Sequence, residues 1–248
     1  MIDPALQLRG VGKSYGPVRA LADIDLDIYL REVVGICGDN GAGKSTLVRL
    51  LSGAEEPSEG QMSQQGRPIR IRSPGAALAR GIATTYQDLA LAPRLSIAEN
   101  VFMGGELLRK PEWLGLLDKG RMRDEAASYL ERFGFGGIDM DRPVSDLSGG
   151  QRQAVALARA LRWNARIVIM DEPTAALGVA ESRVVLDLIR RMRAEGVTII
   201  LVSHDMADVV AVTTRVVILK KGRKAGEIET SRVDAHSLGA MVMSGVVP

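Results

Sequence analysis

Residues 33–46 read VVGICGDNGAGKST, an apolar run that passes directly into a glycine-rich loop. The run 33–37 has the length and Val/Ile content of a strand buried on both faces, and the residues from Lys44 onward have a helical pattern. The segment GDNGAGKST, residues 38–46, fits the spacing G-x-x-x-x-G-K-[ST], whose backbone N–H groups surround phosphate oxygens. This stretch therefore predicts a strand–loop–helix unit that binds a nucleoside triphosphate.

Each residue type in the loop has a physical reason to be there. Glycines let the amides turn toward a ligand, and the following helix N-terminus adds partial positive charge. Lys44 is expected to reach the β and γ phosphates, and the Ser45 hydroxyl is expected to ligate Mg²⁺. The predicted phosphate-binding residues are Gly38, Asp39, Asn40, Gly41, Ala42, Gly43, Lys44, Ser45 and Thr46.

Further short apolar runs predict more strands of the same sheet, and helical patterns lie between them. The runs are at 167–170, 197–202 and 216–219, and the helical patterns are at 151–162 and 181–193. This alternation predicts an α/β core with a parallel or mixed sheet.

Two regions depart from the alternation. Residues 1–32 and 60–72 favour short strands with turns, so we expect an antiparallel β layer beside the core. Residues 90–159 contain helical stretches and are expected to form a helical subdomain inserted between the core segments 1–89 and 160–248.

Two adjacent carboxylates end one of these strands, in IVIMDEP at 167–173. Asp171 suits a Mg²⁺ ligand, and Glu172 suits a base that orients or deprotonates a water. His204 leaves another strand at the same expected sheet edge, where it would contact a γ-phosphate or the water. Taken alone, the acid pair fits a solvated strand end and the histidine a structural role, but a phosphate loop beside them favours catalysis.

A second anion site is predicted at LSGGQ, residues 147–151. Ser148, Gly149 and Gly150 precede the helical pattern 151–162, and a serine-capped helix start with bare amides attracts phosphate. A flexible hinge is the alternative. If both sites serve one γ-phosphate, either the helical subdomain folds back onto the core or two chains meet head to tail.

Composition excludes several other classes. Of 248 residues, 46% are hydrophobic and 25% charged, with a net charge of +2, which does not favour nucleic acid as a partner. The only cysteine, Cys37, lies in the apolar run and is expected to be a buried hydrophobe. No signal peptide or membrane span is apparent, so we expect a cytoplasmic chain, for which docking on a membrane partner stays open.

The combination of GxxxxGKS, LSGGQ and the Asp–Glu pair resembles the nucleotide-binding subunit of ABC transporters over nearly the whole chain. The resemblance implies a P-loop NTPase (RecA-like) α/β core with an antiparallel β subdomain and an inserted helical subdomain. It also implies a homodimer that holds two ATP and Mg²⁺, with residues 148–151, Gln151 included, completing the partner's site.

The same resemblance assigns roles to single residues. Tyr15 matches the aromatic residue that stacks on adenine, and Gln87 matches the Q-loop glutamine that touches Mg²⁺ or the water. Asp171 and Glu172 match the Walker B aspartate and the catalytic glutamate, and His204 matches the switch histidine. Gly178 stands where the family usually has an aspartate that helps join the protomers.

The stretches TYQDLALAP, LDKGRMRDEA and DEPTAALGVAES are similar to ATPases of monosaccharide importers. That similarity implies separate transmembrane permease subunits, an indirect link to a solute-binding protein, and a place on the inner face of the membrane. The alternatives are another importer class, a soluble ABC ATPase acting on ribosomes or DNA, a P-loop GTPase or kinase, and a non-catalytic binder. The lack of an N-K-x-D motif disfavours the GTPase, and the intact Glu172 disfavours the binder.

Overall fold

The computed structural model describes residues 4–175 and 177–247. Its centre is a six-stranded sheet with the order β10-β9-β3-β8-β7-β6, parallel except for the β9–β10 pair. The strands are β3 (Val33–Gly38), β6 (Ile82–Thr85), β7 (Ile167–Asp171), β8 (Thr198–Val202), β9 (Arg215–Lys220) and β10 (Arg223–Glu229). The predicted strands are thus confirmed as members of one mixed sheet, to which β6 and β10 are added.

Alternate residues of the central strands enter two different cores. Ile167 and Ile169 of β7 pack in the core that contains Leu47, whereas Val168 and Met170 pack in the core that contains Leu188. Because both faces are covered, the inner strands β3, β7 and β8 are almost continuously apolar. This explains why short Val/Ile runs marked the strands in the sequence.

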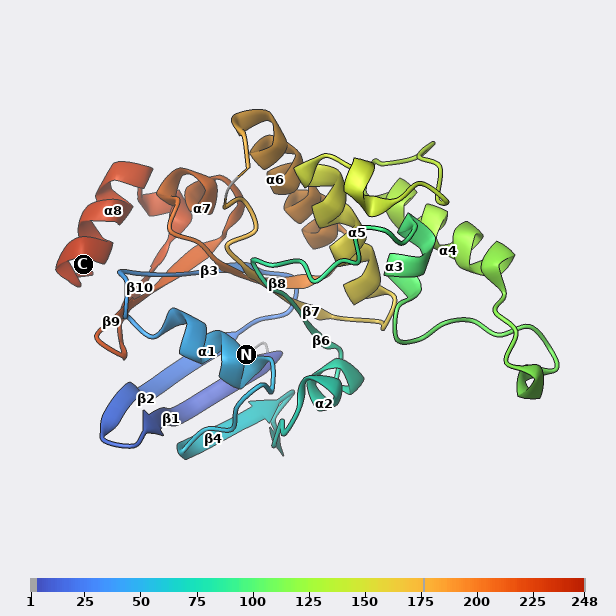
Figure 1. The fold of residues 1–248 in the computed structure, drawn as a ribbon. Coiled ribbons are helices and arrows are strands. Elements are labelled where there is room, and N and C mark those ends of the chain that lie inside the picture. The colour runs from blue at the N-terminus through green and yellow to red at the C-terminus, as the bar shows by residue number, and fades with distance from the viewer. Residues whose placement is uncertain (1–3, 176, 248) are drawn as a thin grey trace.

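The antiparallel layer beside the core is confirmed. It contains β1 (Leu6–Tyr15), β2 (Val18–Ile28), β4 (Glu59–Gln64) and β5 (Arg67–Ile69), in the order β2-β1-β4-β5. Helix α1 (Lys44–Leu51) lies between this sheet and the central one, and the short α2 (Pro74–Ala79) lies near β6 (Figure 1). The buried residues of α1, namely Leu47, Val48, Leu50 and Leu51, pack in the core shared by the two sheets.

Helices on the opposite face of the central sheet include α6 (Val179–Ala194), α7 (Met206–Val212) and α8 (Ala235–Ser244) (Figure 1). The last is preceded by the 3₁₀ turn η3 (Thr230–Arg232). The helix predicted at 181–193 therefore begins slightly earlier than its apolar pattern.

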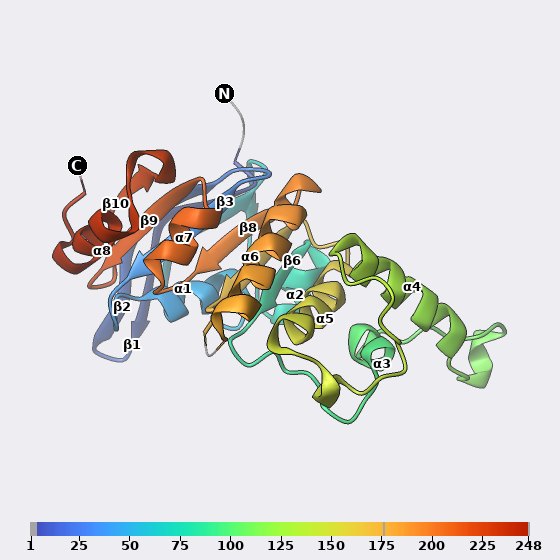
Figure 2. The same ribbon diagram turned by 90° about the horizontal axis from the view of Figure 1, so that it is seen from above.

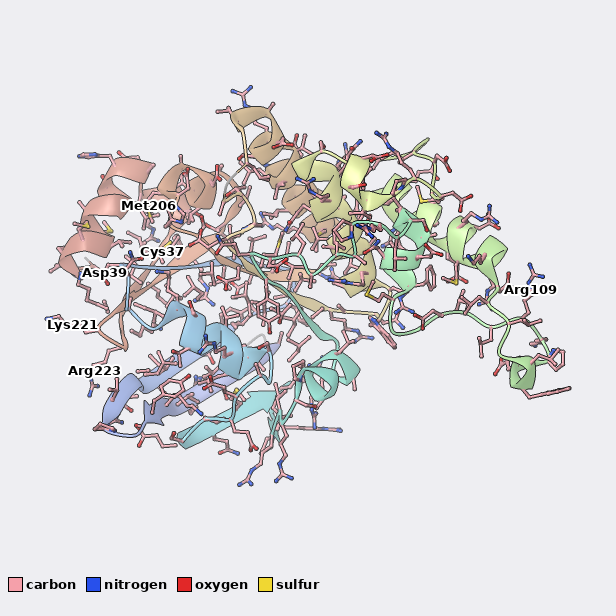
Figure 3. All side chains as sticks on the ribbon, in the orientation of Figure 1. Cys37, Asp39, Arg109, Met206, Lys221 and Arg223 are labelled. Atoms are coloured by element: carbon pink, nitrogen blue, oxygen red, sulfur yellow. The ribbon has the colours of Figure 1, made fainter. Side chains whose placement is uncertain are left out.

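The predicted helical insert extends to one side of the sheet (Figure 2). It contains α3 (Ile97–Phe102), η1 (Glu112–Leu114), α4 (Lys119–Arg132), η2 (Val144–Asp146) and α5 (Gly149–Leu161). Helix α5 continues past residue 159 and packs on both α6 and β6, so the boundary runs through a helix. The largely exposed segment 103–118, between α3 and α4, contains Arg109, which lies at the opposite end of the molecule from Asp39 (Figure 3). No helix of the described residues has the length and apolarity needed to cross a bilayer.

Candidate nucleotide-binding and hydrolysis site

The loop 38–46 presents an array of free backbone donors. Ala42 closes the turn through its N–H to the Asp39 carbonyl at 3.1 Å, and Leu47 donates to Gly43 at 2.9 Å. Within the described residues, the N–H groups of Asn40, Gly41 and 43–46 have no intramolecular acceptor. These amides stand at the N-terminus of α1, an arrangement suited to polyanionic phosphate.

Close packing fixes the path of this loop. A Cβ at Gly38 would lie 2.6 Å from the Leu219 carbonyl oxygen, and one at Gly43 would lie 2.6 Å from Leu21 Cδ2. Gly43 also has φ of +104°, which side chains rarely adopt. Glycine at these positions therefore lets the loop approach β9 and β2 closely.

Lys44 already lies folded over the loop. Its Nζ donates to the carbonyl oxygens of Gly38 at 2.7 Å and Asp39 at 3.0 Å. The Asp39 carboxylate instead accepts from Lys220 Nζ at 2.7 Å, and this bond lowers the pKa of Asp39. Lys220, which sequence reasoning missed, also donates to the Met243 carbonyl at 2.8 Å and so ties the end of α8 to the loop.

The predicted acid pair lies at the carboxyl end of β7, within electrostatic reach of Lys44. Burial and the neighbouring Glu172 raise the pKa of Asp171, and Lys44 partly opposes them. The same Lys44 and Glu172 act on Cys37, whose burial raises its thiol pKa to about 12. Cys37 is therefore the buried, inert thiol that the sequence predicted.

Glu172 and His204 are brought together by a sharp turn of the chain. Glu172 has φ of +51° and donates its N–H to the Val202 carbonyl of β8 at 2.8 Å, so its side chain leaves the strand direction. His204 Nδ1 lies 2.7 Å from Glu172 Oε2. The Glu172 side chain is 17% exposed and that of His204 is 72% exposed. A largely buried carboxylate therefore contacts an imidazole that faces solvent, a geometry suited to a general base.

The LSGGQ segment forms a capped helix start, with one correction to the prediction. Ser148 is the N-cap: its Oγ accepts the Gln151 N–H at 3.3 Å, and Gln151 Oε1 accepts the Ser148 N–H at 2.9 Å. Gly149 and Gly150 belong to the first turn of α5 instead of preceding the helix. The predicted start at 151 was wrong because the serine cap begins the helix two residues before the apolar stripe.

Two further predicted residues are Gln87, in the loop after β6, and Tyr15, the last residue of β1. A hollow of about 420 Å³ is lined by Gln87, Glu172 and Gly149 among others. The Tyr15 hydroxyl is bonded to Glu55, and the Tyr15 ring lies 5.3 Å from Lys13 Nζ. The described residues contain no hydrogen bond between the 38–46 loop and the 147–151 segment.

A phosphate loop on a strand of a mixed α/β sheet, with an acid pair ending a neighbouring strand, defines a P-loop nucleoside triphosphatase. The family model for ABC transporters matches residues 21–175. The chain belongs to the ABC transporter family, and it is an ATP-hydrolysing cassette of that family.

Curated relatives cover most of the chain. The fructose import ATP-binding protein FrcA of Rhizobium meliloti is 48% identical over 227 residues, covering 90% of this chain and 87% of the relative. The ribose import ATP-binding protein RbsA of Chromobacterium violaceum is 41% identical over 236 residues, covering 95% of this chain. The chain spans only 46% of the length of that ribose relative.

Solved structures share the fold. The ATP-binding cassette MJ1267 in its ADP conformation superposes with a TM-score of 0.84 at 23% identity, covering 97% of both chains. The dimeric post-hydrolysis structure of the cassette MJ0796 bound to ADP and Pi has a TM-score of 0.73 at 28% identity. It covers 91% of this chain and 98% of the other.

Proposed function

We propose that this chain is the ATPase subunit that powers import of a monosaccharide through a separate transmembrane permease. The observation that carries the proposal is a pair of anion sites, the loop 38–46 and the helix start 148–151, which no hydrogen bond joins among the residues that the structure describes. Two copies arranged head to tail would bring them together around two ATP molecules. The names of the relatives support sugar as the cargo.

The residues of the loop fit the phosphates of ATP. The free amides of 43–46 and the Lys44 ammonium supply the donors, and Tyr15 supplies a surface for adenine. Mg²⁺ would be held by Ser45, Gln87 and Asp171, where it would neutralise charge on the β and γ oxygens. The described residues contain no cluster of three or more His, Cys, Asp or Glu suited to a metal.

Hydrolysis is assigned to the Glu172–His204 pair. Glu172 takes a proton from the attacking water, and His204, bonded to it at 2.7 Å, keeps the carboxylate turned toward the site. Gln87 lines the same hollow as Glu172 and Gly149, which supports a role at the Mg²⁺ or the water and in sensing the membrane partner. The opposite copy contributes Ser148, Gly149, Gly150 and Gln151.

The permease is proposed to dock beside Gln87. A hollow of about 260 Å³ lies between the core and the helical segment 90–159, lined by Leu78, Tyr86, Met103, Arg159 and Trp163 among others. Aromatic and arginine side chains are typical of interface anchors. Docking there would place the chain on the cytoplasmic face of the membrane, with the solute-binding protein reached only through the permease and with no nucleic acid involved.

The Glu172→Gln variant tests the two-copy site. Glutamine has nearly the shape of glutamate but cannot accept the proton from the water, so the variant should bind ATP without hydrolysing it. Light scattering should then show a stable dimer with ATP and a monomer with ADP. Uptake of labelled fructose, ribose and xylose by cells that carry this variant in place of the wild type tests the cargo. Persistently monomeric Glu172→Gln protein at saturating ATP would refute the two-copy site, and unchanged uptake of all three sugars would refute the sugar assignment.

A further inference from the structure

One carboxylate joins the start of α5 to the start of α6. Glu181, in the first turn of α6, accepts the Gly149 N–H through Oε1 at 2.6 Å, although 32 residues separate them. Its Oε2 accepts the Gly178 N–H at 3.4 Å. Glu181 therefore links the helix start that carries LSGGQ to the N-cap of the helix that follows the acid pair.

The two glycines of α5 make this contact possible. A Cβ at Gly149 would lie 2.4 Å from Leu177 Cδ2 and 3.0 Å from Glu181 Oε1. A Cβ at Gly150 would lie 3.0 Å from Val184 Cγ1. Since no side chain fits between the helices here, the carboxylate reaches the backbone amide directly.

The contact also supplies charge that α5 lacks. The first turn of α5 has no acidic residue, and a carboxylate near a helix N-terminus is favourable. Glu181 takes the Gly149 amide and Ser148 takes that of Gln151, whereas within the described residues the Gly150 N–H has no acceptor. The Gly150 N–H, between two hydrogen-bonded amides, is therefore free to bind an external anion.

We propose that Glu181 is a positioning residue for ATP hydrolysis. It fixes the turn 148–150 against α6, so that the free Gly150 amide keeps the place it needs for the phosphate of the nucleotide bound by the second copy. The inference rests on the two-copy arrangement proposed above. The Glu181 contact also couples the acid pair to the turn 148–150 within each copy, because α6 begins shortly after the acid pair.

Variants in the Glu172→Gln background test the proposal. Glu181→Ala removes the link, Glu181→Gln keeps an oxygen that accepts from Gly149, and Asp187→Ala is a matched control. Asp187 is an exposed acid of the same helix that pairs only locally, with Arg190 at 2.6 Å. Binding of a fluorescent ATP analogue at low protein concentration reports the single chain, sedimentation velocity reports ATP-driven dimerisation, and thermal melting monitors folding.

Glu181→Ala should weaken dimerisation by about tenfold or more, the factor expected for losing a hydrogen bond to a charged group. Nucleotide affinity of its single chain should stay within about twofold, because the link does not touch the 38–46 loop. Glu181→Gln should recover dimerisation to within about threefold, and Asp187→Ala should behave as the parent.

Three results would overturn the inference. The first is normal dimerisation of Glu181→Ala. The second is stronger dimerisation of both Glu181 variants, which would show that the carboxylate only competes with phosphate. The third is an equal loss of single-chain binding and dimerisation, which would show a general folding defect. If the Glu172→Gln parent itself stays monomeric, the two-copy site falls and this inference with it, whereas a failure confined to the Glu181 variants leaves the proposed function standing.

Discussion

Alanine at Gly43 separates the shape of the phosphate loop from its chemistry, since it adds one methyl group and no charge. Gly43 has φ of +104°, and its new Cβ would lie 2.6 Å from Leu21 Cδ2 and 3.0 Å from the Ala20 carbonyl oxygen. Gly41 provides the matched control. Its φ is +80°, yet nothing lies within 4 Å of a Cβ built there.

The cost of each variant follows from these two differences. Backbone strain at a positive φ costs about 1–3 kcal/mol. Forcing a methyl group into a filled space adds about 1–3 kcal/mol. Gly43→Ala should therefore lower the free energy of unfolding by about 2–6 kcal/mol, whereas Gly41→Ala should lower it by the strain alone, about 1–3 kcal/mol.

Urea unfolding without nucleotide measures both values, and ATP binding is measured on the folded proteins. We expect Gly43→Ala to bind ATP more weakly as well, because relief of the overlap moves the start of α1 and its free amides away from β2. Equal losses of stability in the two variants would refute the packing argument, since only strain would then matter. Unchanged ATP affinity in Gly43→Ala would show that the amides do not depend on this close approach.

Three shorter predictions concern Cys37, Asp171 and His204. Burial raises the Cys37 thiol pKa from 9.0 to about 12, so its contribution to the free energy of unfolding is fully present below pH 9.0 and is lost as the pH rises toward 12. In Cys37→Ala, the free energy of unfolding measured with urea should therefore depend less on pH between 9.0 and 12. Burial raises the pKa of Asp171, so the ionised carboxylate opposes folding at neutral pH. Asp171→Asn should therefore melt at a higher temperature than the wild type, while its Mg²⁺-dependent ATPase activity is lost. His204→Ala should lower kcat by about 10²-fold with little change in KM for ATP, because it frees Glu172 without touching the phosphate loop; a change in KM alone would contradict this role.

Local patterns were sufficient for most of the fold. Strands buried on both faces must be apolar along their length, so the sequence marks them as short apolar runs. Four such runs form neighbouring strands of the central sheet, at 33–37, 167–170, 197–202 and 216–219. The strand β6 escaped prediction because Ile82–Thr85 has a single large apolar residue and half of it is threonine. Start and stop signals were less reliable, as the serine cap at 148 showed for α5.

The sequence alone determined the chemistry of this protein: a glycine-rich phosphate loop after a strand, an acid pair ending a second strand, and a serine-capped helix start. Those signals are contiguous, so they can be read along the chain. Only the tertiary structure decided which groups act on each other, namely Lys220 on Asp39 across 181 residues, His204 on Glu172, and Glu181 on Gly149. A hydrogen bond depends on distances of a few ångströms in space, and the chain carries no local mark of the residue that folding will bring to that distance.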